Sequence, residues 1–79
     1  PKNDAELVLV EVSSPGDVEA VKAILRARIN TMVSGGAWFP EATQVWTDHA
    51  RIAVQGNYIM LVVHTQCDAV VNAFQSLFS

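Results

Sequence analysis

The sequence predicts an α+β fold, a two-layer sandwich in which two helices cover one face of a three-stranded antiparallel sheet. Three segments rich in alternating apolar residues indicate strands, and a Gly-Asn turn joins two of them. Two further segments carry apolar residues at helical spacing. The expected order along the chain is therefore strand, helix, strand, strand, helix.

The composition favours one folded domain with one core. The chain has 79 residues, of which 51% are hydrophobic and 16% are charged, so burial can offset the loss of chain entropy. We expect a single domain over residues 6–79, after a polar leader at residues 1–5. The net charge is -3 and the Lys and Arg residues are scattered, so no basic stripe indicates a nucleic-acid partner.

The first strand and the first helix are expected between residues 6 and 36. Residues 6–13 are rich in β-branched residues and contain neither Gly nor Pro. Ser14 and Pro15 then indicate a helix start, and Gly35 with Gly36 indicates its end. Arg28 lies beside the apolar stripe and is expected to meet a carboxylate such as Glu41 or Asp48. The helical stripe consists of Val18, Val21, Leu25, Ile29 and Met32.

Residues 50–63 are predicted to form a β-hairpin around Gly56 and Asn57, because a two-residue loop favours residue types that tolerate positive φ. The register follows by counting from the turn, so Gln55 lies opposite Tyr58 and His49 lies opposite His64. The strand over residues 58–63 is the most apolar and is expected to be central. One face of the hairpin is wholly apolar and consists of Ala50, Ile52, Val54, Ile59, Leu61 and Val63.

The chain is expected to end in a helix that begins near Thr65. Its apolar stripe consists of Cys67, Val70, Val71, Phe74, Leu77 and Phe78. Residues 37–48 are the least regular stretch, and we expect a loop there with a short helical turn near residues 41–45.

The sheet face turned away from both helices is expected to bind a partner. Too much of it is apolar for exposure to water, so either the aromatic loop folds over it or another chain does. A homodimer or a protein partner would then use this face or the loop. The candidate partner-binding residues are Leu7, Leu9, Tyr58, Met60, Val62, Trp38, Phe39 and Trp46.

The stretch at residues 38–46 and the hairpin at residues 50–63 together resemble a bacterial family known as domain-of-unknown-function family 4358. The recognisable parts are Gly56-Asn57-Tyr58 and an upstream aromatic-Pro-Glu motif, and the resemblance extends from about residue 6 to residue 78. Members of this family look like exported lipoproteins of Gram-positive anaerobes. The resemblance implies an extracytoplasmic, cell-envelope location with a membrane anchor outside this segment, and it brings no activity, cofactor or catalytic residue.

A small hydrolase or a metal-binding site is the alternative function. His49 and His64 lie opposite each other in the predicted hairpin, and Cys67 follows at the start of a helix. Zinc needs more than two ligands, and the candidates for the rest are Asp48, Cys67 and Glu11, but no motif spacing supports them. A solvated histidine pair and a buried cysteine explain the same residues. We therefore expect no catalytic residue, cofactor or metal, and favour a non-catalytic module that binds a protein or a second copy of itself.

Overall fold

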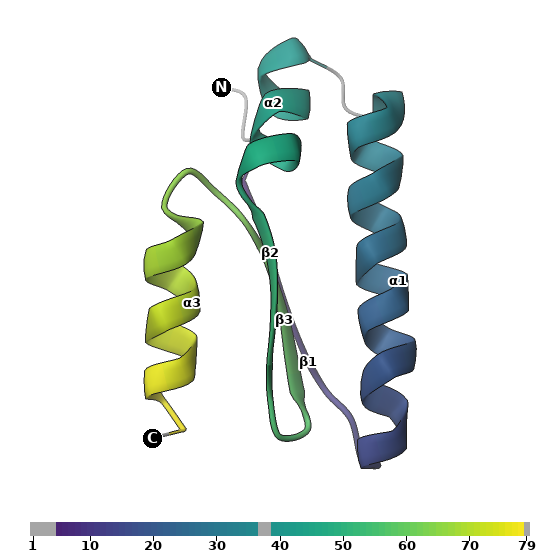
Figure 1. Ribbon diagram of the computed structural model, residues 1–79, viewed down its shortest axis with the longest axis vertical. Coiled ribbons are helices and arrows are strands. Elements are labelled where there is room, and N and C mark those ends of the chain that lie inside the picture. Colours follow the sequence, from purple (N-terminus) through teal and green to yellow (C-terminus); the bar gives the residue numbers. More distant parts are fainter. Residues whose placement is uncertain (1–4, 37–38, 79) are drawn as a thin grey trace.

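Figure 1 shows the computed structural model, which describes residues 5–36 and 39–78. The described part of the chain is an α+β fold with a three-stranded antiparallel sheet in the order β1-β3-β2, so the predicted fold class is confirmed. The elements in chain order are β1 (Glu6–Glu11), η1 (Pro15–Asp17), α1 (Val18–Thr31), η2 (Met32–Gly36), α2 (Pro40–Asp48), β2 (Ala50–Gln55), β3 (Tyr58–Val63) and α3 (Cys67–Ser76).

The hairpin formed by β2 and β3 has the register that the sequence predicts. Gln55 pairs with Tyr58, and beyond the strands the His64 N–H donates a hydrogen bond of 3.1 Å to the His49 carbonyl. Gly56 has a φ of 57°, as required at the first position of this type of turn, where a side chain would strain the backbone. On its other side β3 pairs with β1, with Glu11 opposite Tyr58, so β3 is the central strand.

The helices α1 and α2 pack on one face of the sheet. Every second side chain of β3 points toward this face. These side chains are Ile59, Leu61 and Val63, and all three are fully buried. Val8 and Val10 of β1 are partly buried against the same cluster. The buried members of this core are Val12, Val18, Leu25, Trp46, Ile59, Leu61 and Val63.

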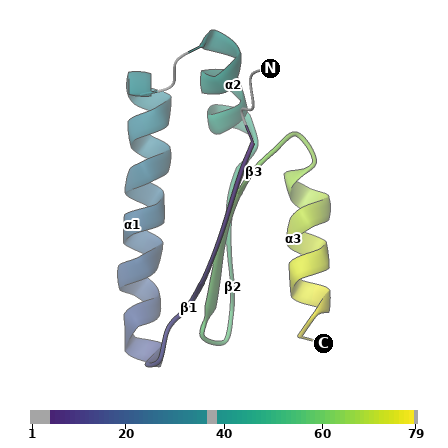
Figure 2. The same ribbon diagram turned by 180° about the vertical axis from the view of Figure 1, so that it is seen from behind.

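The helix α3 packs on the opposite face, so the structure has three layers (Figures 1 and 2). Cys67 and Phe74 of α3 are buried with Met60 and Val62 of β3 in a second cluster. The prediction that both helices cover one face is therefore wrong. The physical reason is that side chains alternate along β3, which leaves Met60 and Val62 on the far side, and the apolar stripe of α3 is what removes them from water.

Residues 40–48 form the helix α2, where a loop with one helical turn was expected. Pro40 stands in the first turn, where its missing N–H costs nothing, and Ala42 and Trp46 are buried one turn apart. The hydroxyl of Thr47 donates a 2.8 Å hydrogen bond to the Thr43 carbonyl. The helix contains only nine residues and therefore too few apolar positions for its period to be distinct in the sequence.

The helix α1 starts and ends at the predicted signals. Pro15 opens the short turn η1 after Ser14, and α1 follows without a break. At the other end η2 contains Gly35 at a φ of 117°, which only glycine adopts without strain. Over residues 5–36 and 39–78, the helices are all too short or too polar to span a bilayer.

Leu61 is expected to be one of the main contributors to stability. Leu61→Ala should lower the free energy of unfolding by about 2–5 kcal/mol, because it removes packing contacts and leaves a cavity at a fully buried position. Leu77→Ala is the matched control, since Leu77 is 80% exposed and its loss should change the free energy by less than about 0.5 kcal/mol. Urea unfolding followed by tryptophan fluorescence measures both values, and similar losses would contradict this assignment of the core.

Candidate functional site

The strand β1 forms one edge of the sheet, and its outer side chains are exposed. Leu7 and Leu9 are 65% and 60% exposed, whereas Val8 and Val10 point inward and are half-buried. The helices α1 and α3 pack mainly against β2 and β3. Figure 2 looks toward β1, with α1 on one side of the sheet and α3 on the other. No helix of the described residues therefore covers the outer face of β1 at Leu7 and Leu9.

The backbone of β1 offers hydrogen-bonding groups along this edge. The Val12 N–H donates a 2.9 Å hydrogen bond to the Asn57 carbonyl, so even-numbered residues of β1 direct their backbone groups toward β3. Because these directions alternate in an antiparallel pair, the N–H and C=O groups of Leu7 and Leu9 point away from β3. The strand contains no Pro, Lys or bulge, and its charged residues Glu6 and Glu11 stand only at its two ends, so its middle lacks the usual features that protect an edge from further pairing.

The helix α1 adds an exposed apolar side chain on the same side of the molecule. Ile24 is 66% exposed and precedes Arg28 by four residues, and the side chain of Arg28 reaches Glu6 of β1. Residues four apart share one side of a helix, so Ile24 also lies on the β1 side of α1. We call the exposed side chains of Leu7, Leu9 and Ile24, together with the open backbone edge of β1, the β1 surface.

A cavity of about 330 Å³ continues the β1 surface toward α3. It lies between the start of β1, the end of β3 and the first half of α3, and its lining is mostly apolar. Its lining residues are Ala5, Glu6, Leu7, Val62, Val63, His64 and Val70. A side chain of a bound chain that lies beside Leu7 therefore has room to enter between β1 and α3.

Glu6 and Arg28 hold the start of β1 against α1. The Arg28 Nε and Nη2 atoms donate hydrogen bonds of 2.5 and 2.6 Å to the two carboxylate oxygens of Glu6. The hydrogen bond to Glu6 raises the pKa of Arg28, although partial burial opposes the rise. The guanidinium also lies 5.4 Å from the centre of the Trp46 ring. A structural tether was expected at Arg28, but its partner is Glu6 rather than Glu41 or Asp48.

Glu11 and Tyr58 lie side by side at the other end of β1. They are paired across the strands, and a hydrogen bond from the phenol to the Glu11 carboxylate raises the pKa of Tyr58. The Tyr58 and Phe78 ring centroids are 5.3 Å apart, and Phe74 lies at the same distance from Phe78. The residues after α3 therefore cover this end of the outer face, and the exposed part of β1 is centred on its leucines.

Three of the candidate partner-binding residues are buried and do not contribute to the surface. Met60 and Val62 are 4% and 3% exposed because α3 covers them. Trp46 is 3% exposed because α2 turns its side chain into the core shared with α1. A partner could reach these side chains only if a helix moved away.

The other candidates stay accessible to different degrees. Leu7 and Leu9 are the most exposed, Phe39 is 41% exposed before α2, and Tyr58 is half-buried beneath Phe78. Trp38 lies outside the described residues. Ile24 was not a candidate, and its position at the border of the helical stripe was the only sign in the sequence that it could lie at the surface.

The residues proposed for a metal site do not gather around one point. Within residues 5–36 and 39–78, no three or more His, Cys, Asp or Glu side chains are placed to hold a metal ion. His49 and His64 are joined through their backbones, and the Nδ1 atom of His64 accepts a 2.9 Å hydrogen bond from the Gln66 N–H. This bond orients the His64 ring within the turn before α3.

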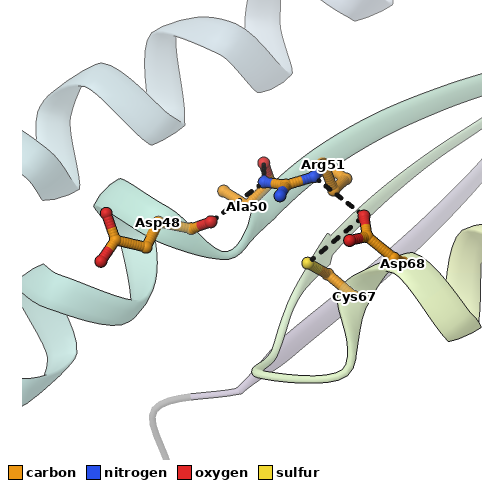
Figure 3. A network of polar contacts seen from close by, with 5 residues as sticks. All are labelled: Asp48, Ala50, Arg51, Cys67 and Asp68. Carbon is orange, nitrogen blue, oxygen red and sulfur yellow. Dashed lines mark hydrogen bonds and ion pairs between the residues drawn. The ribbon is translucent and has the colours of Figure 1, made fainter.

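Cys67 is a buried side chain at the start of α3. It is 1% exposed, and its Sγ atom lies 4.0 Å from the Asp68 carboxylate, as Figure 3 shows. That carboxylate accepts a 3.2 Å hydrogen bond from the Arg51 Nε, and the Arg51 Nη1 donates to the carbonyls of Asp48 and Ala50. The contacts join α3 to β2, and the thiol is not placed where a substrate could meet it.

Comparison with protein-family models, curated proteins and solved structures found no match to this chain. The resemblance to family 4358 and the extracytoplasmic location that it implies therefore stay predictions. The function has to be inferred from the surface of the molecule itself, where the β1 surface is the most distinctive feature of the described residues.

The Cys67 thiol is expected to react slowly in the folded protein. Because its side chain is 1% exposed, alkylation requires opening of α3 and should be at least about 100-fold slower than in urea-unfolded protein. Iodoacetamide labelling followed by mass spectrometry measures both rates. A Ser13→Cys, Cys67→Ala variant supplies an exposed thiol as the control. If Cys67 in the folded wild-type protein reacted as fast as this exposed thiol, the result would contradict its burial and favour the hydrolase alternative.

The phenol of Tyr58 is expected to ionise above the usual value of 10.0. Since the pKa is higher in the folded state, the hydrogen bond to Glu11 stabilises the fold below pH 10, and this stabilisation is lost as the pH rises through the folded pKa. Tyr58 is the only tyrosine, so an ultraviolet titration of phenolate absorbance reports it alone. Glu11→Gln should lower its pKa, the control Glu19→Gln should not, and an unchanged value in Glu11→Gln would contradict the contact.

Proposed function

We propose that this domain is a non-catalytic protein-interaction module that binds its partner at the β1 surface. The observation that carries the proposal is the exposure of Leu7 and Leu9, at 65% and 60%, on a strand whose other edge is unpaired within the described residues. Neighbouring large apolar side chains at the surface are typical of binding sites. Open edge strands are likewise typical sites of pairing with another chain.

The β1 surface offers two kinds of interaction to an extended segment of protein. The backbone groups of Leu7 and Leu9 supply directional hydrogen bonds, and removal of the two side chains from water supplies up to about 1.5–3 kcal/mol for each. The cavity beside Leu7 accommodates a further side chain of the bound segment. A strand from another polypeptide satisfies all three features, whereas a small molecule would leave most of the edge unpaired.

Site-directed photo-cross-linking in cells that make the protein tests this proposal. A photoreactive residue at position 9 should form covalent adducts with other polypeptides, because Leu9 lies at the centre of the β1 surface. The same residue at position 30 is the control, since Asn30 is exposed on α1 and lies away from the side that carries Ile24 and Arg28. Absence of adducts at position 9, or equal adducts at both positions, would overturn the proposed function.

A further inference from the structure

The β1 surface is self-complementary. We infer that two copies of this chain associate about a two-fold axis through Val8, with their β1 strands paired antiparallel, so that the two sheets join into one sheet of six strands. This inference rests on the proposed function and names its partner as a second copy.

The backbone of β1 limits the possible registers. Only Leu7, Leu9 and the other odd-numbered residues direct their N–H and C=O groups toward the open edge. An antiparallel pair of β1 strands must therefore place odd-numbered residues opposite each other. Three symmetric registers bring leucines together across the edge, and they are centred on Leu7, on Val8 and on Leu9.

The outer side chains select the register centred on Val8. In this register each Leu7 lies opposite the partner's Leu9, and four leucines form one cluster on the outer face. In the register centred on Leu9 each Leu7 would instead lie opposite Glu11, and in the register centred on Leu7 each Leu9 would lie opposite Ala5. Either register therefore pairs only two of the four leucines. The apolar pattern Leu-Val-Leu at residues 7–9 is thus symmetric about the proposed axis.

Ile24 supports the same axis from the inner face. It precedes Arg28 by four residues, a rise of about 6 Å along the helix. Two residues of a strand advance by about the same distance, and α1 runs antiparallel to β1 in Figure 1. Because Arg28 reaches Glu6, Ile24 lies farther along β1, in the direction of Val8. A two-fold axis at Val8 therefore turns the two exposed Ile24 side chains toward each other, and apolar residues flank the joined edge on both faces.

The charges near the edge are compatible with a second copy. The chain carries a net charge of -3, so a self-association surface has to keep its acids apart or neutralised. Glu6 is neutralised by the paired hydrogen bonds from Arg28 and would lie opposite an apolar Val10. The two Glu11 residues lie at opposite ends of the paired strands. No carboxylate of β1 faces another carboxylate in this register.

Solution mass by light scattering across a concentration series tests the inference. The wild-type chain should change from monomer to dimer as its concentration rises, and moderate salt should not dissociate the dimer, because the contacts are apolar and backbone-mediated. Leu9→Lys should be monomeric throughout, since an edge lysine opposes pairing. Leu77→Lys is the matched control and should keep the wild-type mass, and circular dichroism should show that both variants are folded.

A disulfide trap tests the register. In a Cys67→Ala background, Val8→Cys should form an intermolecular disulfide on mild oxidation, because the two copies of residue 8 face each other at the axis. Val10→Cys in the same background is the control and should stay reduced, since residue 10 lies opposite residue 6. Cross-linking at position 10 in preference to position 8 would overturn the register.

The results separate this inference from the proposed function. A wild-type chain that stays monomeric, or a dimer that survives Leu9→Lys, would overturn pairing through β1. If position 9 then forms photo-adducts with a different protein, the interaction function stands and only the second copy is excluded. A monomer that also gives no adduct at position 9 overturns both.

Discussion

The fold depends on the burial of β3 on both of its faces. Ile59, Leu61 and Val63 are fully buried on one side, and Met60 and Val62 are almost fully buried on the other. A strand of this kind needs an apolar layer on each side, because either set of side chains would otherwise meet water. The constraint places α1 and α3 on opposite faces and makes β1 and β2 the flanking strands.

The β1 surface follows from the same constraint. Two helices that are centred on β2 and β3 cover both faces of those strands, but within residues 5–36 and 39–78 no further element covers the outer side of β1. The exposed positions of Leu7 and Leu9 therefore result from a shortage of covering elements in a small domain, where much of the surface is necessarily apolar. The tether between Glu6 and Arg28 keeps this uncovered strand in place.

The sequence predicted the structural features that depend on residues close together in the chain. It did not predict the contacts between residues far apart in the chain. The hairpin register follows from the two residues of its turn, and the central position of β3 follows from its apolar run. The alternation of side chains along the strands predicted that both faces of the sheet carry apolar residues. It could not predict which segment would cover the second face. The pairing of Arg28 with Glu6 joins residues 22 positions apart, and no local pattern specifies such a partner. The exposure of Ile24 likewise depends on how α1 lies across the sheet.

The two hydrophobic clusters are separated by the sheet, and α1 and α2 cover the first whereas α3 covers the second. The cluster beneath α3 shares no buried member with the cluster beneath α1, so detachment of α3 alone would leave the cluster beneath α1 intact. Partial opening of this kind has its own free energy, which is smaller than that of global unfolding. Whenever α3 detaches, Met60 and Val62 join Leu7 and Leu9 in one continuous apolar face. The stability of α3 on the sheet therefore sets how much apolar surface the domain exposes to water at any moment.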